Sequence, residues 1–258
     1  MTHMAIDLSE YRVSAQEQVR IRDLFELIPQ RGARALDVGT RDGYLAKRLA
    51  ERFDEVVALD LERPNIDHPG ITPVKGDVAH LEFPDGHFDV VLCAEVLEHI
   101  PPALLATVCS ELQRVSRDMV VIGVPYRQDL RLGRTTCAHC GRPNPPWGHV
   151  NSFDERRLEQ LFSRCRVERS TFVGKTSTCS NALSCWLLDH AGNPYGTWEQ
   201  DEPCVHCGEP IGQPAGRNLA QKIGTRIAMQ LNRIQQRFTP PRGNWIHVGF
   251  RKIAHGPS

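Results

Sequence analysis

The sequence predicts an α/β fold in which a doubly wound, seven-stranded and mostly parallel sheet carries helices on its faces. Three observations predict it. Strand-like apolar runs alternate with segments of helical periodicity over the first half of the chain, which is typical of parallel sheets. The first run, Ala33–Val38, leads directly into a loop that contains Gly39 and Gly43. An isolated strand-like run, Trp245–Lys252, stands near the C-terminus and completes the seven.

The individual elements follow from apolar spacing and from the residues that end each run. A first helix is expected over Val13–Ile28, because apolar residues recur there at helical intervals and Pro29 stops it. The next elements, in chain order, are strand Ala33–Val38, helix Gly43–Phe53, strands Val56–Leu61, Ile71–Lys75 and Phe88–Cys93, helix Ala103–Val115, strand Met119–Val124, helix Glu155–Phe162 and strand Val167–Val173. Asn181–Leu188 is the alternative to Trp245–Lys252 as the last strand.

Two irregular segments, 126–148 and 174–244, interrupt this alternation. If Trp245–Lys252 is the last strand, both segments start from the carboxyl edge of the sheet, where α/β proteins bind ligands. We therefore expect a single domain over residues 1–258, with the two insertions forming a lid or subdomain at that edge.

Composition restricts the class of protein. The 258 residues include 31 basic and 31 acidic ones, and 40% are hydrophobic, so nothing in the overall charge calls for a nucleic-acid partner. Residues 1–7 lack the pattern of a secretory signal, and no run is long enough to span a membrane. We expect a cytoplasmic protein, in which the nine cysteines indicate metal ligation or buried thiols rather than disulfides.

The glycine loop favours a cationic cofactor. A dinucleotide fingerprint would place glycine at positions 39, 41 and 44, but the chain has Gly39, Arg41 and Tyr44. Asp37, just before the loop, would repel phosphate and attract a sulfonium or an amine. Asp60 ends the next strand, 23 residues after Asp37, at the distance where such folds bind ribose hydroxyls. The alternative for Asp60 is an aspartate that only caps a turn.

At these residues the chain resembles the class I S-adenosylmethionine-dependent methyltransferases, whose first motif is an acidic residue followed by a glycine-rich loop. Arg41 departs from that motif, because many members have glycine there. Residues 74–78 and 88–100 resemble later motifs, so that the resemblance covers residues 11–174 and the last strand. It implies a Rossmann-like methyltransferase whose cofactor site comprises Asp37, Gly39, Gly43, Asp60, Leu61, Asp77, Val78 and Glu95.

Each insertion carries one Cys-x-x-Cys-Gly sequence. The two pairs are Cys137 with Cys140 and Cys204 with Cys207, and four thiolates suit a tetrahedral zinc ion. The wide separation of the pairs predicts a site that joins the insertions, and four protein ligands make the zinc structural. A redox function is the weaker alternative, because neither pair follows a strand and opens a helix.

Two histidines are candidates for the catalytic base. His99 follows the run 88–94, and His149 precedes the helix Glu155–Phe162, so both should lie at the ligand edge, where an imidazole could accept a proton from a hydroxyl acceptor. The alternative is that they cap helices or pack. The sequence Glu95, Glu98, His99 also resembles that of metal-dependent methyltransferases of RNA 3′ ends and quinone precursors. That resemblance implies a Mg²⁺ site completed by His149, although family members without a metal contain similar sequences.

The segment Arg217–Phe238 has one continuous apolar stripe at helical spacing. Its members are Leu219, Ile223, Ile227, Leu231, Ile234 and Phe238, accompanied by Lys222, Arg226, Arg233 and Arg237 and by no acidic residue. The stripe could pack on a neighbouring element. Alternatively, the helix could make peripheral contact with an anionic membrane or a phosphate-bearing acceptor.

The resulting hypothesis is an S-adenosylmethionine-dependent methyltransferase that acts on a small-molecule or saccharide acceptor, which could be lipid-linked. One alternative is an RNA methyltransferase, although the zero net charge disfavours it. Another is a catalytically silent cofactor-binding scaffold protein. The sequence determines neither the acceptor atom nor the oligomeric state.

Overall fold

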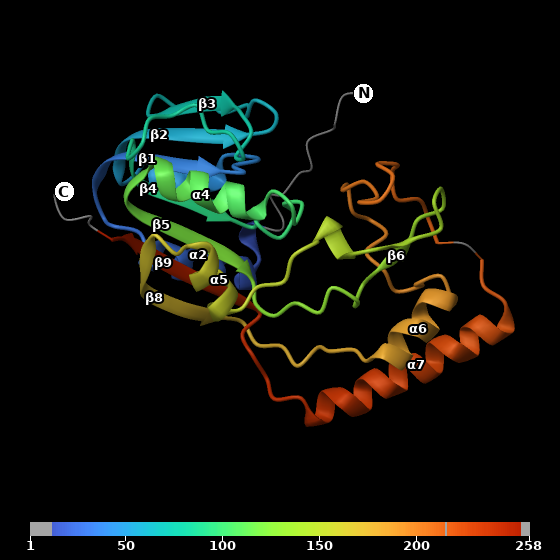
Figure 1. The fold of residues 1–258 in the computed structure, drawn as a ribbon. Coiled ribbons are helices and arrows are strands. Elements are labelled where there is room, and N and C mark those ends of the chain that lie inside the picture. Colours follow the sequence, from blue (N-terminus) through green and yellow to red (C-terminus); the bar gives the residue numbers. More distant parts are fainter. Residues whose placement is uncertain (1–11, 215, 254–258) are drawn as a thin grey trace. The chain divides into compact units, whose positions relative to one another are not determined.

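The computed structural model describes residues 12–214 and 216–253, in two compact units (Figure 1). The sheet unit comprises the chain up to Tyr126, Phe153–Gly174 and the chain from Asn244. The insertion unit comprises Arg127–Ser152 and Lys175–Gly243. Residues 1–7, on which the argument against a secretory signal rests, lie outside the described residues.

The sheet unit contains the predicted seven-stranded sheet. Its strands are β1 (Gly32–Val38), β2 (Phe53–Asp60), β3 (Ile71–Lys75), β4 (Phe88–Ala94), β5 (Ser116–Pro125), β8 (Cys165–Val173) and β9 (Trp245–Lys252). Their order is β3-β2-β1-β4-β5-β9-β8, and β9 runs antiparallel to both of its neighbours. The doubly wound, mostly parallel fold is therefore confirmed, with Trp245–Lys252 inside the sheet rather than at its edge.

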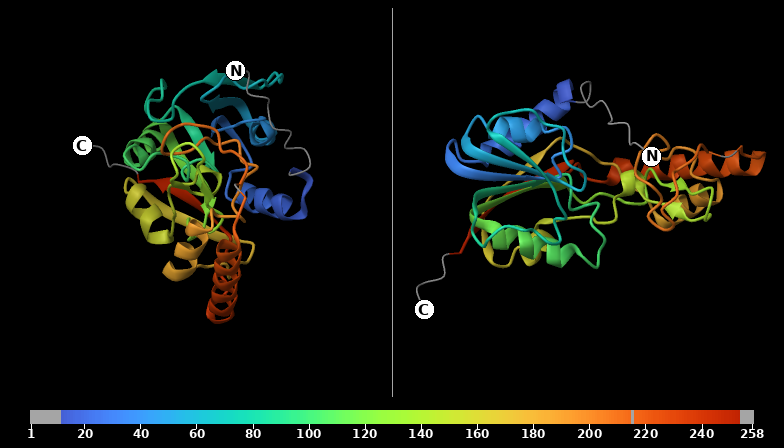
Figure 2. Two further views of the ribbon diagram at one scale, coloured as in Figure 1. Left: turned by 90° about the vertical axis from the view of Figure 1, so that its right-hand side faces the viewer. Right: turned by 90° about the horizontal axis from the view of Figure 1, so that it is seen from above.

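Helices cover both faces of this sheet (Figure 2). They are α2 (Ala15–Glu26), α3 (Tyr44–Leu49), α4 (Leu105–Val115) and α5 (Glu155–Leu161). Alternate residues of β4 enter opposite apolar clusters: Val91 and Cys93 pack with α4 and α5, whereas Val90 and Leu92 pack with α2 and α3. This two-residue period is the reason why a strand buried on both faces reads as a continuous apolar run.

The structure differs most clearly from the sequence prediction at the end of one helix and at the alternative last strand. The helix expected over Gly43–Phe53 ends at Leu49, and Phe53 instead begins β2 opposite Gly32. A Cβ atom on Gly32 would lie 2.3 Å from the ring of Phe53, so this glycine makes room for the aromatic side chain. Asn181–Leu188, the alternative last strand, lies in α6 (Ala182–His190), which Asn181 caps. That alternative was wrong.

The insertion unit consists of short elements and one long helix. It contains β6 (Thr135–Thr136), β7 (Pro143–Asn144), the 3-10 turn η1 (Pro146–Gly148), α6, and α7 (Leu219–Phe238). Strands β6 and β7 form a small antiparallel ribbon, and α6 packs against α7. Among the described residues, no helix is both long and apolar enough to cross a membrane.

Candidate functional site

The loop between β1 and α3 has a backbone that side chains would obstruct. Gly39 and Gly43 adopt φ angles of 71° and 72°. A Cβ atom at either position would lie 2.4 Å from an apolar side chain, that of Val96 or Ile66. Arg41 also has a positive φ, 48°, so it adopts the conformation of the glycine that it replaces. The loop therefore keeps a glycine-like backbone despite the arginine.

Asp37 lies beneath this loop rather than in contact with solvent. It is 1% exposed, and its carboxylate accepts a hydrogen bond of 2.6 Å from the hydroxyl of Thr40. Burial raises the pKa of Asp37 to about 7, against the hydrogen bond from Thr40, which lowers it. A cation bound at the loop would favour the ionised form. Direct cofactor contact by Asp37 stays a prediction.

Asp60, at the end of β2, supports the same loop. Its carboxylate accepts the backbone N–H groups of Arg41 at 2.9 Å and Leu61 at 2.7 Å. A carboxylate has about four acceptor positions, so two remain for hydroxyl donors such as those of a ribose. Leu61 is largely exposed beside it, and this apolar side chain can cover an adenosine.

Asp77 and Val78 follow β3, at the same edge of the sheet. The carboxylate of Asp77 is exposed and accepts the backbone N–H of Ala79 at 2.8 Å, whereas Val78 is buried in the apolar core. The parallel strands thus place Asp60 and Asp77, two residues of the predicted cofactor site, at neighbouring strand ends.

Glu95 follows β4 with a φ of 58°. Its carboxylate accepts the indole N–H of Trp245 at 3.2 Å and lies 3.5 Å from the guanidinium of Arg20. Burial raises the pKa of Glu95, and Arg20 opposes that rise. The strained backbone and two partners fix the side chain at the carboxyl end of the central strand.

Arg20, which lies beside Glu95, forms a buried ion pair with Glu17 that the sequence pattern did not lead us to predict. Arg20 is buried in α2 and forms an ion pair of 2.7 Å with Glu17, one turn earlier. Both residues lie on the same helical face as the buried Ile21 and Leu24. The sequence did contain a signal, since Glu17 and Arg20 are oppositely charged, three residues apart and on an apolar helix face. Charged residues on such a face are buried only when each has a partner, so the spacing indicates a buried ion pair.

Glu98 and His99 lie in the turn after β4. Glu98 is 0% exposed, and neither carboxylate oxygen has a hydrogen-bond partner among the described residues. Burial and the neighbouring Glu95 raise the pKa of Glu98 well above its ordinary value. His149 belongs to the insertion unit, where its Nδ1 lies 2.7 Å from the amide oxygen of Gln128. The Mg²⁺ site and the catalytic function of the two histidines stay predictions.

The four predicted zinc ligands come together within the insertion unit. All four sulfur atoms lie within 4.8 Å of one another. The Sγ atoms of Cys137 and Cys207 are 3.7 Å apart, and those of Cys140 and Cys204 are 3.8 Å apart. A tetrahedron with zinc–sulfur bonds of about 2.3 Å has edges of about 3.8 Å. The spacing is therefore that of a metal-binding thiolate cluster.

The two Cys-x-x-Cys-Gly segments have matching backbones. The N–H of Gly141 donates to the carbonyl of Cys137 at 2.9 Å, and that of Gly208 donates to Cys204 at 2.8 Å. Both glycines have φ angles above 69°. Hydrogen bonding from the backbone N–H of Cys140 lowers the pKa of Cys137 to about 6. Each segment thus has the backbone turn that is typical of a zinc knuckle.

Comparison with known proteins establishes the family. The model of a methyltransferase domain matches residues 13–165, which is more than half of the chain. The chain belongs to this methyltransferase family. This membership confirms the resemblance to the class I S-adenosylmethionine-dependent methyltransferases that the glycine loop and Asp60 indicate.

The similar proteins agree on this family. The ubiquinone biosynthesis O-methyltransferase of Albidiferax ferrireducens is 29% identical over 106 residues, covering 36% of this chain and 42% of its own length. The chain thus spans about two fifths of that relative. The N-methyltransferase NodS of Bradyrhizobium japonicum, solved with S-adenosyl-L-homocysteine, has a TM-score of 0.54 at 13% identity and covers 96% of this chain and 93% of its own. A methyltransferase of Archaeoglobus fulgidus has a TM-score of 0.52 at 15% identity, with coverages of 95% and 97%. At these identities the structures show the fold alone.

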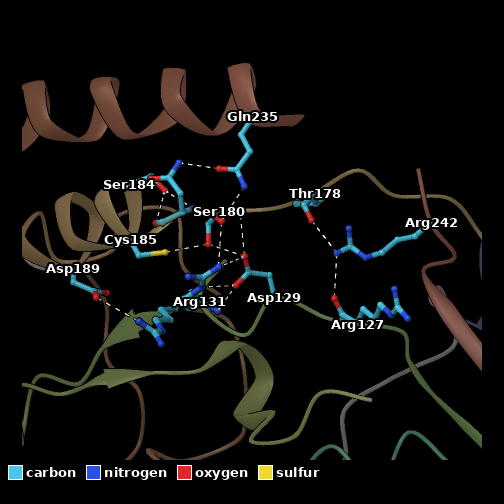
Figure 3. A network of polar contacts seen from close by, with 12 residues as sticks. Arg127, Asp129, Arg131, Thr178, Ser180, Ser184, Cys185, Asp189, Gln235 and Arg242 are labelled. Carbon is cyan, nitrogen blue, oxygen red and sulfur yellow. Dashed lines mark hydrogen bonds and ion pairs between the residues drawn. The ribbon is translucent and has the colours of Figure 1, made fainter. Parts of the chain in front are cut away.

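The insertion unit of the methyltransferase also contains an open concavity of about 610 Å³. Its lining includes three arginines, Arg127, Arg131 and Arg242, and one acidic residue, Asp129. Figure 3 shows the polar network around it, in which Asp129 accepts hydrogen bonds from Arg131 at 2.9 Å and from Ser180 at 2.7 Å. Arg131 is therefore paired with Asp129, and the lining contains two further arginines, Arg127 and Arg242.

Arg242 has unused hydrogen-bonding capacity in this lining. Its Nη2 donates to the backbone carbonyls of Thr178 at 2.9 Å and Arg127 at 3.2 Å (Figure 3). Its Nε is buried and has no hydrogen-bond partner among the described residues. A buried donor without a partner costs free energy. The residue as a whole lines the concavity, where its guanidinium suits a ligand that accepts hydrogen bonds.

Proposed function

We propose that this methyltransferase transfers a methyl group from S-adenosylmethionine to a small molecule or a saccharide that carries an anionic group, including a lipid-linked one. The observation that carries the proposal is the arginine-lined concavity of about 610 Å³ in the insertion unit. Its volume lies in the range of small-molecule sites. Its excess of arginines suits a phosphate or carboxylate.

The residues at the sheet edge fit the cofactor. Asp60 has free acceptor positions beside the N–H groups that it already holds, and Asp77 presents an exposed carboxylate at the next strand end. We assign ribose binding to Asp60 and adenine binding to Asp77, with Gly39 and Gly43 allowing the close approach. The cofactor supplies an electrophilic methyl group bound to a sulfonium.

The chain's own contribution to the reaction is positioning and proton removal. Methyl transfer needs the acceptor atom in line with the departing sulfur, so holding the acceptor accounts for much of the rate. A hydroxyl acceptor must also lose its proton. We propose His99 and His149 as candidate bases, because an imidazole can accept a proton at neutral pH.

The relatives support a small-molecule acceptor. Several are named for ubiquinone biosynthesis and for O-methylation, which are small-molecule reactions on oxygen. The RNA alternative has weaker support, because the chain carries no excess of basic residues over its 258 positions.

We also propose that Cys137, Cys140, Cys204 and Cys207 hold a structural Zn²⁺. The sulfur separations of 3.7 and 3.8 Å support it. With all four positions occupied by protein, the ion would stabilise the insertion unit and take no part in the transfer.

The test is turnover of labelled S-adenosylmethionine against a panel of phosphorylated and unphosphorylated phenols and saccharides. We expect turnover of phosphorylated members, and Arg242→Gln should raise KM for that acceptor at least ten-fold while the Kd of the cofactor stays constant. Lys175→Gln, an exposed change in the insertion unit outside the concavity, is the matched control. The proposal of an anionic acceptor would be contradicted if only unphosphorylated acceptors were turned over and Arg242→Gln had no effect on them. Salt-sensitive turnover of RNA would contradict the proposal of a small-molecule acceptor.

The candidate bases are tested on the same acceptor. Replacement of the true base by alanine should lower kcat roughly 10²-fold to 10⁴-fold without changing cofactor affinity. If neither His99→Ala nor His149→Ala lowers kcat by ten-fold, positioning alone carries the reaction.

A further inference from the structure

Helix α7 exposes its apolar stripe. The stripe residues Leu219, Ile223, Ile227, Ile234 and Phe238 are 74, 50, 49, 54 and 82% exposed. Together with the half-buried Leu231 they recur every three or four residues, so they form one line along the 20-residue helix. A line of large, exposed apolar side chains is uncommon on the surface of a protein that has no partner there.

The stripe is not the face by which α7 packs against its neighbour. The buried residues of the helix are Thr225, Ala228 and Asn232, which lie about half a turn away from Ile223 and Ile227. A Cβ atom on Gly224 would lie 3.6 Å from Leu187 of α6. A face of small and polar residues thus packs against α6, and the larger apolar face stays outside. The helix thus packs on a neighbouring element, as one sequence alternative expects, but through a face other than the stripe.

Basic residues border the stripe on one side. Lys222, Arg226, Arg233 and Arg237 each precede a stripe residue by one position, and the helix contains no acidic residue. All four are exposed. Two copies of this face would repel each other, because like charges would meet. An apolar stripe beside a basic row instead complements a membrane of acidic lipids, in which anionic headgroups cover an apolar interior.

We propose that α7 docks the methyltransferase on an anionic membrane surface, with the stripe inserted between headgroups and the basic row paired with lipid phosphates. The helix would lie in the plane of the membrane, since no described helix is able to cross one. This inference goes beyond the proposed function, because it concerns where the enzyme acts and holds for any acceptor.

Sedimentation with vesicles tests the proposal on the full-length, zinc-loaded protein. We expect binding to vesicles of phosphatidylcholine with about one third phosphatidylglycerol, and at least ten-fold weaker binding to phosphatidylcholine alone. The double variant Ile227→Asp, Ile234→Asp should weaken binding to the mixed vesicles at least ten-fold. Arg226→Gln with Arg233→Gln should weaken it about five-fold per residue and reduce its salt dependence, which Lys222 and Arg237 keep in part.

Val13→Asp is the matched control, because Val13 is an exposed apolar residue of the sheet unit and is not part of α7. It should bind vesicles like the wild type. Zinc content and cofactor affinity, measured on every variant, show that both units remain folded. No sedimentation with the mixed vesicles, or equal sedimentation of the Asp double variant, would overturn the proposal. So would a concentration-dependent dimer that the double variant abolishes, because a second copy would then cover the stripe.

Discussion

The two units of this methyltransferase are stabilised by different interactions. Both large apolar clusters of the described residues lie entirely in the sheet unit. In the insertion unit the buried side chains are mainly polar, such as Thr135, Asn144 and Asn193, or belong to the thiol cluster, such as Cys137 and Cys204. A regular fold buries apolar surface through periodic patterns. An irregular segment lacks such patterns and is stabilised by individual interactions, which in the insertion unit are the thiol cluster and side-chain hydrogen bonds.

The two units also shift the pKa of a carboxyl group in opposite directions. In the sheet unit, burial raises the pKa of Asp37 to about 7. In the insertion unit burial also raises the pKa of Asp129, but hydrogen bonds from Arg131 and Ser180 outweigh it and lower the pKa to about 2. Ionisation of the buried Asp37 thus destabilises the sheet unit, whereas ionisation of the partly buried Asp129 stabilises the insertion unit.

Removal of the metal should have the largest effect. A structural zinc contributes on the order of 10 kcal/mol to folding, and the insertion unit has no large apolar cluster among its described residues to replace it. Chelation, or Cys204→Ser, should unfold residues 127–152 and 175–243 while the sheet unit stays folded. Hydrogen exchange measured by mass spectrometry resolves the two. Cys179→Ser, outside the cluster, should change nothing, and an unchanged exchange pattern after complete zinc removal would show that the insertion unit folds without metal.

Asp37→Asn should remove a large pH dependence from the sheet unit. The folded pKa of about 7 lies above the ordinary 3.8, so wild-type stability falls as pH rises from about 4 to about 7, by about 4 kcal/mol in full. The variant should therefore be more stable than wild type at pH 8 and equal to it at pH 4, as measured by urea unfolding. Cofactor affinity should fall, because the charge that attracts the sulfonium is lost. The exposed Asp54→Asn is the control, and parallel pH profiles of wild type and Asp37→Asn would contradict the assignment.

Asp129→Asn should have the opposite sign in the insertion unit. Its folded pKa of about 2 lies below 3.8, so Asp129 contributes stability at pH values above about 4 and loses it as the pH falls toward 2. The full contribution is about 2 kcal/mol. We expect faster hydrogen exchange in residues 127–152 of the variant at pH 7, with little difference from wild type near pH 2. Asp201→Asn, an exposed change in the same unit, should leave exchange unaltered.

Arg41→Gly should have the smallest effect. A non-glycine residue with a φ of 48° costs about 1 kcal/mol relative to glycine, so the variant should be more stable by about that amount in urea unfolding. Arg41→Lys should not be, because lysine retains the same strain. A destabilised Arg41→Gly variant would mean that the arginine side chain contributes more than its backbone costs. The cofactor Kd of the variant also tells whether that side chain enters the site.

The sequence allowed the sheet unit to be predicted nearly element by element. Strands such as Ile71–Lys75 and Trp245–Lys252 match their predicted bounds, because their limits are set by local apolar patterns. Phe53 was assigned to a helix instead of β2, since only the packing of its ring over Gly32 decides the boundary. The burial of Arg20 beside Glu95 escaped prediction for a similar reason, because the partner lies 75 residues away.

The sequence alone was enough to predict where the strands lie along the chain, which loop carries the cofactor motif with Asp60, and which two Cys-x-x-Cys-Gly segments come together. These depend on residue type and short spacing, which sterics and metal geometry fix locally. Only the tertiary structure decided that Asp37 is buried beneath its loop, that Arg242 lines a concavity, and that the stripe of α7 faces outward. Burial and exposure depend on which distant segments pack together, and periodicity identifies an apolar face without telling what covers it.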